Sequence, residues 1–87
     1  MSDETRWIDG LAEAMGVSPL TSSEAERLLQ AARDVAHLTE RKATPLAAFL
    51  MGVGVATRMC EGIGRQAAFD DALQTMARAL PQPTGEV

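Results

Sequence analysis

The chain has 87 residues, of which 46% are hydrophobic and 23% charged, and its formal net charge is −4. This composition predicts one globular domain, and the acidic balance argues against a protein that binds nucleic acid through a basic surface. A single Cys excludes an internal disulfide and any metal or redox site that needs several cysteines. With two Phe, one Trp and no Tyr, the apolar residues are those that favour helices over strands.

The first expected helix covers about residues 4–15. Asp3 is a suitable N-cap for it, and Gly16 is a stop signal at its end. Helical spacing gathers its large apolar residues into one stripe, whereas acidic residues occupy the opposite side. The members of the stripe are Trp7, Ile8, Leu11 and Met15.

A second helix is expected after the loop "GVSPLTSS", which is rich in turn-forming residues. Thr21 and Glu24 have the spacing of a capping box, in which hydroxyl and carboxylate satisfy backbone N–H groups at the start of a helix. We expect this helix to last to about Thr39 or Glu40. The residues expected on its buried face are Leu28, Leu29, Ala32, Val35 and Ala36.

The third helix has the clearest start signal, because Thr44 is a natural N-cap and Pro45 then occupies the first helical position. Almost every position from there to Ala56 is apolar, so we expect this helix to be surrounded on most sides. It is either the central helix of the domain or half of a partner interface. The apolar run of 12 residues is shorter than the ~18 residues expected of a membrane span.

Two glycines, Gly52 and Gly54, interrupt this apolar run within the segment "GVGVAT". A dinucleotide-binding motif would need a preceding strand and a helix that opens at the glycines. Here both glycines lie inside the expected helix, where each costs about 1 kcal/mol relative to Ala. Close packing against a neighbouring helix is the simplest compensation, so we expect packing and no nucleotide at this position.

A fourth helix is expected from about residue 66 to residue 80, after a break marked by Gly62 and Gly64. Its apolar stripe consists of Phe69, Leu73, Met76 and Leu80. Residues 81–87 contain two prolines and predict a flexible C-terminal tail, which leaves residues 1–80 as a single helical domain. The predicted fold is all-α, a compact antiparallel four-helix bundle.

The segment "RDVAHLTER" is the best candidate for a functional site. Arg33, His37 and Arg41 are spaced i, i+4 and i+8, so they share a face if the helix extends that far. Asp34 precedes His37 by three residues and could orient the imidazole. These four residues are the candidate binding site for a small anion such as a phosphate or carboxylate, close to the N-terminus of the third helix. The alternative is a solvated helix face with stabilising ion pairs.

Catalysis is not expected. A nucleophile pair of Cys60 and His37 would have to meet across helices, and no third group is evident to orient it. Cys60 fits the apolar face of the third helix and is expected to be a small buried thiol. One His and scattered carboxylates predict no metal site, and no cofactor is expected. The start "MSDETRWIDG" lacks the apolar segment of a signal peptide, so we expect a cytoplasmic protein that has no membrane partner.

The chain resembles a small domain of unknown function known mainly from actinobacteria, which occurs alone or appended to molybdenum-cofactor guanylyltransferase-like proteins. The resemblance covers about residues 7–56 and extends more loosely over the fourth helix. The connection "ERKAT" and the segment "RMCEGIGRQ" depart from the family pattern. The residues that carry the resemblance are Trp7, Leu11, Ala12, Ala32, Arg33, Asp34, Ala36, His37, Arg41, Pro45, Leu46, Phe49, Leu50 and Gly52.

This resemblance implies an association with the biosynthesis of molybdopterin guanine dinucleotide, and it supplies no catalytic residue. We therefore expect a non-catalytic accessory or binding module that docks on a guanylyltransferase-like protein or a molybdoenzyme, or holds an anionic ligand. The alternative is a structural homodimer that is built on the third helix and binds no ligand.

Overall fold

The computed structural model describes residues 3–81, with side chains from Trp7 onward. Within this range the chain forms helices joined by short loops and contains no strand. The predicted all-α fold, a four-helix bundle, is confirmed. The helices are α1 (Asp3–Ala14), α2 (Ser22–Leu38), α3 (Ala43–Cys60) and α4 (Arg65–Ala79).

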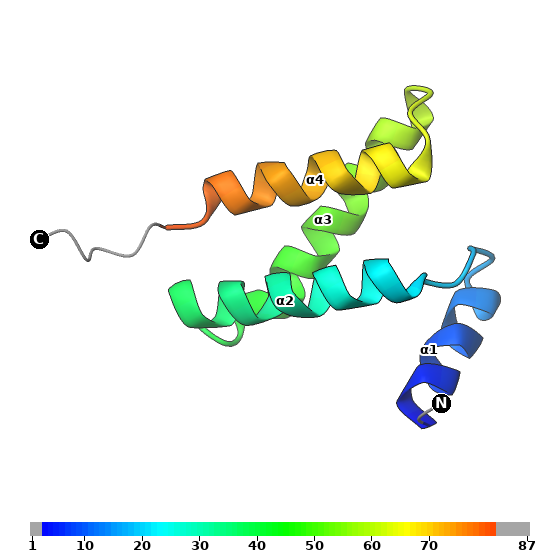
Figure 1. Cartoon of the computed structure of the whole chain (residues 1–87), viewed down its shortest axis with the longest axis horizontal. Coiled ribbons are helices and arrows are strands. Elements are labelled where there is room, and N and C mark those ends of the chain that lie inside the picture. Colours follow the sequence, from blue (N-terminus) through cyan, green and yellow to red (C-terminus); the bar gives the residue numbers. More distant parts are fainter. Residues whose placement is uncertain (1–2, 82–87) are drawn as a thin grey trace, which may run out of the picture.

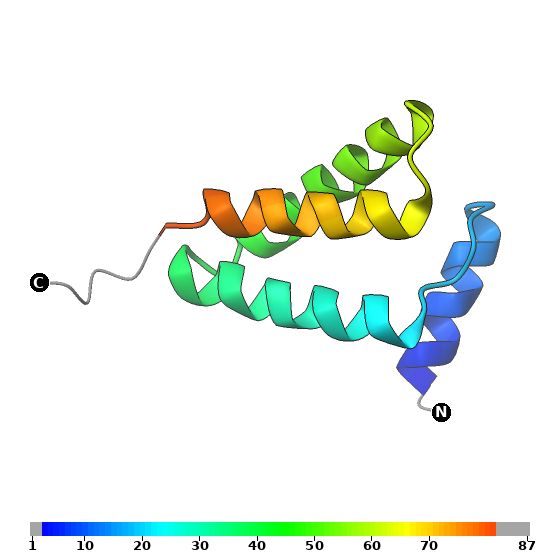
Figure 2. The same cartoon turned by 45° about the horizontal axis from the view of Figure 1, so that its top comes forward.

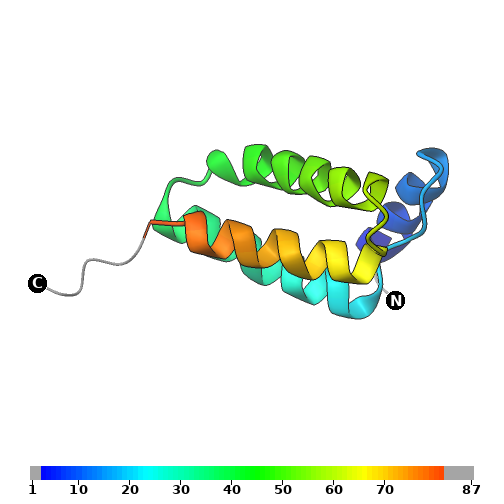
Figure 3. The same cartoon turned by 90° about the horizontal axis from the view of Figure 1, so that it is seen from above.

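Helix α3 is the element that holds the bundle together. It packs against α4 and, less extensively, against α2. Consecutive helices among these three run in opposite directions, so α2 and α4 point the same way on one side of α3 (Figure 1). Helix α1 stands apart at the end where α2 begins, and it remains apart when the molecule is turned (Figures 2 and 3).

The start of α2 forms as its sequence predicts. Thr21 is the N-cap, and its hydroxyl accepts a hydrogen bond of 3.0 Å from the backbone N–H of Glu24. In return the Glu24 carboxylate accepts one of 2.9 Å from the backbone N–H of Thr21. Both halves of the capping box are therefore present, and they fix the first turn of α2.

The predicted start of α3 is wrong by two residues. The helix begins at Ala43 with Lys42 as its N-cap, and Lys42 contributes no capping hydrogen bond from its side chain. The backbone N–H of Thr44 already donates to the carbonyl of Arg41, so this threonine lies inside the first turn and cannot be the cap. Pro45 is consequently the third helical residue, where its missing N–H still falls among the N–H groups that have no helical partner.

The buried core is small. Met51, Phe69 and Ala72 form its centre, where α3 meets α4. Met51 is the only residue of α3 that is buried, so the expectation that this helix is surrounded on most sides is wrong. On α2, Val35 is buried as expected, whereas Leu29 is exposed because it lies on the side turned away from α3 and α4. The part-buried residues around the centre are Leu28, Val55, Leu73 and Met76.

Two further expectations about α3 are wrong for the same reason, which is that α2 and α4 leave much of its surface open. A Cβ atom added to Gly52 would meet nothing within 4 Å, and one added to Gly54 would meet only the Arg58 guanidinium at 3.2 Å. The glycines therefore do not mediate close helix packing within the chain. Cys60, expected to be buried, is exposed at the last residue of α3.

Gly16 ends α1 as predicted. It has a φ of 73°, a left-handed conformation that favours glycine. The N–H of Gly16 donates to the carbonyl of Glu13, and the N–H of Val17 donates to that of Ala12, each at 3.0 Å. This pair of bonds is a Schellman motif, and it fixes the direction in which the chain leaves α1. The predicted C-terminal tail lies outside the described residues except for Pro81.

Candidate functional site

Three of the residues predicted to bind an anion, Arg33, Asp34 and His37, lie in the last turns of α2. Arg33 donates a hydrogen bond of 2.8 Å to the amide oxygen of Gln30. The amide nitrogen of Gln30 donates one of 3.1 Å to the Asp34 carboxylate. Asp34 is thus engaged one turn back along its own helix. His37 is exposed in the last turn of α2, where a positive charge interacts favourably with the helix dipole.

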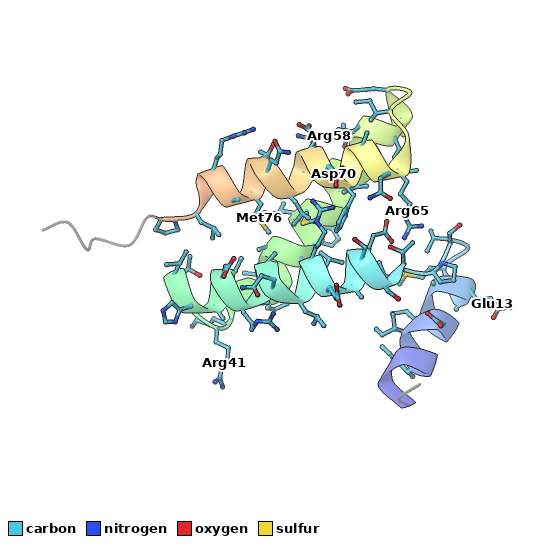
Figure 4. The ribbon with its side chains drawn as sticks, viewed as in Figure 1. Glu13, Arg41, Arg58, Arg65, Asp70 and Met76 are labelled. Atoms are coloured by element: carbon cyan, nitrogen blue, oxygen red, sulfur yellow. The ribbon has the colours of Figure 1, made fainter. Side chains whose placement is uncertain are left out.

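Arg41 does not share the helical face of Arg33 and His37, because α2 ends at Leu38 and Arg41 lies in the turn that follows. Its side chain points away from α3 and α4 (Figure 4). An open hollow of about 250 Å³ between α2 and α4 is lined by Asp34 but not by Arg33, His37 or Arg41. The four residues thus share a region of the surface, and their binding of an anion stays a prediction.

The opposite end of α2 carries an ion pair of which one partner is buried. The Glu24 side chain is only 3% exposed, and that of Arg65 is 33% exposed. Arg65, the first residue of α4, donates to both carboxylate oxygens of Glu24, from Nε to Oε2 at 3.0 Å and from Nη2 to Oε1 at 2.9 Å. This bidentate arrangement matches the planar guanidinium to the planar carboxylate and joins α4 to the start of α2.

The same guanidinium also holds the loop between α1 and α2. Arg65 Nη1 donates to the carbonyl of Ser18 at 2.9 Å, and Nη2 donates to that of Pro19 at 3.3 Å. Figure 4 shows Arg65 reaching from α4 towards this loop. One side chain therefore joins three segments of the chain.

The surroundings of Glu24 act on its pKa in opposite directions. Burial raises the pKa of this carboxyl, because it disfavours the charged form. The hydrogen bond from the Thr21 backbone, the hydrogen bonds from Arg65 and the charge of Arg65 all lower it, and together they outweigh burial. The pKa of Glu24 consequently lies below its usual value of 4.5, and the group is ionised at neutral pH.

An open apolar groove of about 730 Å³ runs beside this ion pair. Its floor and walls come from α2, α3, α4 and the loop after α1. Glu24 and Arg65 are the charged residues of its lining. The rest of the lining is mainly apolar and suits an apolar side chain or helix face. The groove is lined among others by Leu28, Ala48, Gly52, Val55, Ala56 and Phe69.

The side of α3 turned away from the core is a second apolar surface. Phe49 is 71% exposed and Leu50 is 68% exposed, with Leu46 and Val53 beside them. We call these four residues the outer face of α3. With 18 residues and a mean hydropathy of 1.3, α3 is long and apolar enough to cross a membrane by length and composition alone, a test that core helices of soluble proteins also pass.

Sequence spacing missed every ion pair of the described chain, because each joins residues far apart in sequence. Asp70 and Asp71 of α4 pair with Arg27 of α2 and Arg58 of α3 respectively. Figure 4 shows Asp70 on α4 turned towards α2. The capping box pointed to Glu24, but nothing in the sequence pointed to Arg65. Among residues 3–81 no group of three His, Cys, Asp or Glu residues is placed to hold a metal ion.

A family model described as a domain of unknown function, DUF6457, matches residues 1–86. No curated protein and no solved structure is significantly similar to the chain.

Proposed function

The chain belongs to the DUF6457 family, a domain of unknown function, and we propose that it is a non-catalytic helical module that binds a protein partner. The observation that carries the proposal is the outer face of α3, where Leu46, Phe49, Leu50 and Val53 are all exposed. Contiguous apolar surface of this kind marks interaction sites on soluble proteins. A large aromatic residue beside aliphatic ones is also the composition of the energetic centre of many interfaces.

The proposed partner is a guanylyltransferase-like protein or a molybdoenzyme of molybdopterin guanine dinucleotide biosynthesis in the cytoplasm. This part of the proposal rests on the resemblance to actinobacterial domains that occur alone or appended to guanylyltransferase-like proteins. A fusion holds the two domains together covalently. A copy that stands alone has to bind its partner through a surface, and the outer face of α3 is the one that suits this role.

The position of the reactive side chains supports a non-catalytic role. Cys60 is the last residue of α3, whereas His37 lies at the end of α2 just before α3 begins. A helix of 18 residues, about 27 Å long, separates the two ends. The thiol and the imidazole therefore do not form a nucleophile and base pair.

Titration calorimetry between the full chain and a purified guanylyltransferase-like protein from the same organism tests the proposal. Replacing Leu50 by Gln on the outer face should weaken binding at least about tenfold, because it removes a buried apolar contact worth more than about 1.4 kcal/mol. Leu29→Gln is the matched control, since Leu29 is equally exposed but lies on α2. Equal affinities for the wild type and the Leu50 variant would contradict the proposed surface.

A further inference from the structure

Helix α1 has an apolar stripe that the described chain covers only in part. Trp7 is 66% exposed and Met15 69% exposed at its two ends, whereas Ile8 and Leu11 between them are 37% and 36% exposed. The helix stands away from α2, α3 and α4 (Figure 1). An amphipathic helix of 12 residues is marginal in water unless its apolar face is packed, so this stripe requires a partner surface.

The groove beside α3 has the shape of such a surface. Ala48, Gly52 and Ala56 follow one another at intervals of four residues and all line the groove. This row of small residues allows a second helix to approach the α3 backbone, and the open space at Gly52 shows that no segment of the described chain does so. The row is about 12 Å long, the same length as the stripe from Trp7 to Met15.

The α1 of the same chain is held away from this groove. Its exit is fixed by the Schellman motif at Gly16 and Val17. The next residues of the loop are held by Arg65, which binds the carbonyls of Ser18 and Pro19. Folding α1 back onto the groove would break the Schellman motif, whereas the α1 of another molecule meets no such constraint.

We propose that the protein forms a dimer by reciprocal exchange of α1, in which the Trp7–Met15 stripe of each copy fills the groove beside α3 of the other. Each copy donates one helix to its partner and accepts one in return. The interface is therefore symmetric, and no binding surface of this kind is left over to add a third copy. In this dimer Trp7 of one copy packs against the Ala48–Gly52–Ala56 row of the other. The outer face of α3 remains open, so the inference does not rest on the proposed function.

Light scattering of the full chain after size-exclusion chromatography measures the oligomeric state. We expect twice the chain mass of 9.3 kDa, and a concentration-dependent emission shift from Trp7, the single tryptophan. Gly52→Leu places a large side chain in the groove and should weaken dimerisation at least tenfold, and its Cβ atom meets nothing of its own chain within 4 Å. Ala67→Leu, an equal side chain on the exposed surface of α4, is the control and should leave the dimer intact.

Mixing two defective variants tests the exchange itself. Trp7→Asp disrupts the apolar stripe of α1 and leaves the groove unchanged. Gly52→Leu blocks the groove and leaves the stripe unchanged. Each variant alone should therefore be monomeric. A mixture restores one intact helix–groove pair, and we expect dimers in the mixture that neither variant forms alone. Circular dichroism checks that both variants remain helical.

Three outcomes would overturn the inference. The first is a wild-type chain that is monomeric at all concentrations, which would mean that α1 folds onto its own groove or that the groove is empty. The second is a dimer that Gly52→Leu leaves unchanged, which would place the interface elsewhere, such as on the outer face of α3. The third is a monomer that binds phosphatidylcholine vesicles, which would make lipid the partner of the apolar surfaces.

Discussion

The two ends of α2 carry similar residues in very different surroundings. At the first end Glu24 is buried and bound by Arg65, which comes from a helix that begins 41 residues later in the sequence. At the other end Arg33 and Asp34 are linked through Gln30 on one exposed helix face. Removing one partner of an ion pair that joins separate elements away from water is costly, because it leaves a charge without compensation, whereas an exposed polar network along a single helix contributes little.

The sharpest way to break this contrast is to replace Arg65 by Met. The change leaves Glu24 charged and buried and also frees the carbonyls of Ser18 and Pro19. We expect the free energy of unfolding, measured by urea denaturation, to fall by about 2 kcal/mol, less than for a fully buried pair, because the Arg65 side chain is already 33% exposed. Arg33→Met at the exposed end is the matched control, with an expected loss below about 0.5 kcal/mol. Equal losses would mean that the two ends do not differ energetically.

The pH dependence of stability should come mainly from the buried end. Because the pKa of Glu24 is lowered in the folded state, the unfolded chain takes up a proton first as the pH falls. The stabilisation by this carboxylate is therefore complete above about pH 4.5, the usual value, and is lost as the pH falls through the folded pKa.

Urea denaturation at a series of pH values between about 5 and 3 measures this loss. We expect the Glu24→Gln variant to lose less stability over this range than the wild type, since its side chain has no proton to gain. Glu26→Gln, at an exposed position two residues later, should keep the wild-type slope. A slope that is the same in all three proteins would assign the acid sensitivity to other carboxylates.

Thr21 offers a smaller test at the same end. Thr21→Ala removes the hydroxyl that accepts the backbone hydrogen bond of Glu24. The expected loss is about 1 kcal/mol in the free energy of unfolding, as for other N-cap substitutions. Thr21→Ser keeps an acceptor and should recover most of the loss. If Ser and Ala are equally destabilising, the capping hydrogen bond is not the source of the effect.

The same contrast explains how much of this molecule its sequence predicts. Helix existence, the capping box of Thr21 and Glu24 and the stop at Gly16 follow from residues a few positions apart, and the structure confirms them. The pairing of Glu24 with Arg65 depends on where α4 begins relative to α2, which no local spacing encodes.

Burial was predicted least well, and α3 shows why. Its apolar sequence predicts that the helix is shielded from water, but it does not predict which element covers each face. Gly52 and Cys60 were expected to be packed, and both lie where α2 and α4 do not reach. Apolar residues that belong in an interface between molecules have the same periodicity as residues of a core, so the pattern alone cannot separate the two.

The smallest expected effect is at the exposed end of α2. His37→Ala removes an exposed side chain from the last turn, and we expect the free energy of unfolding to change by less than about 0.5 kcal/mol at neutral pH. Because the fold does not need this imidazole, the variant isolates its role in binding. Melting with and without millimolar inorganic phosphate measures that role for the predicted site of Arg33, Asp34, His37 and Arg41. A phosphate-dependent rise that His37→Ala abolishes would establish an anion site there, whereas identical melting in both proteins would reduce the segment to a solvated helix face.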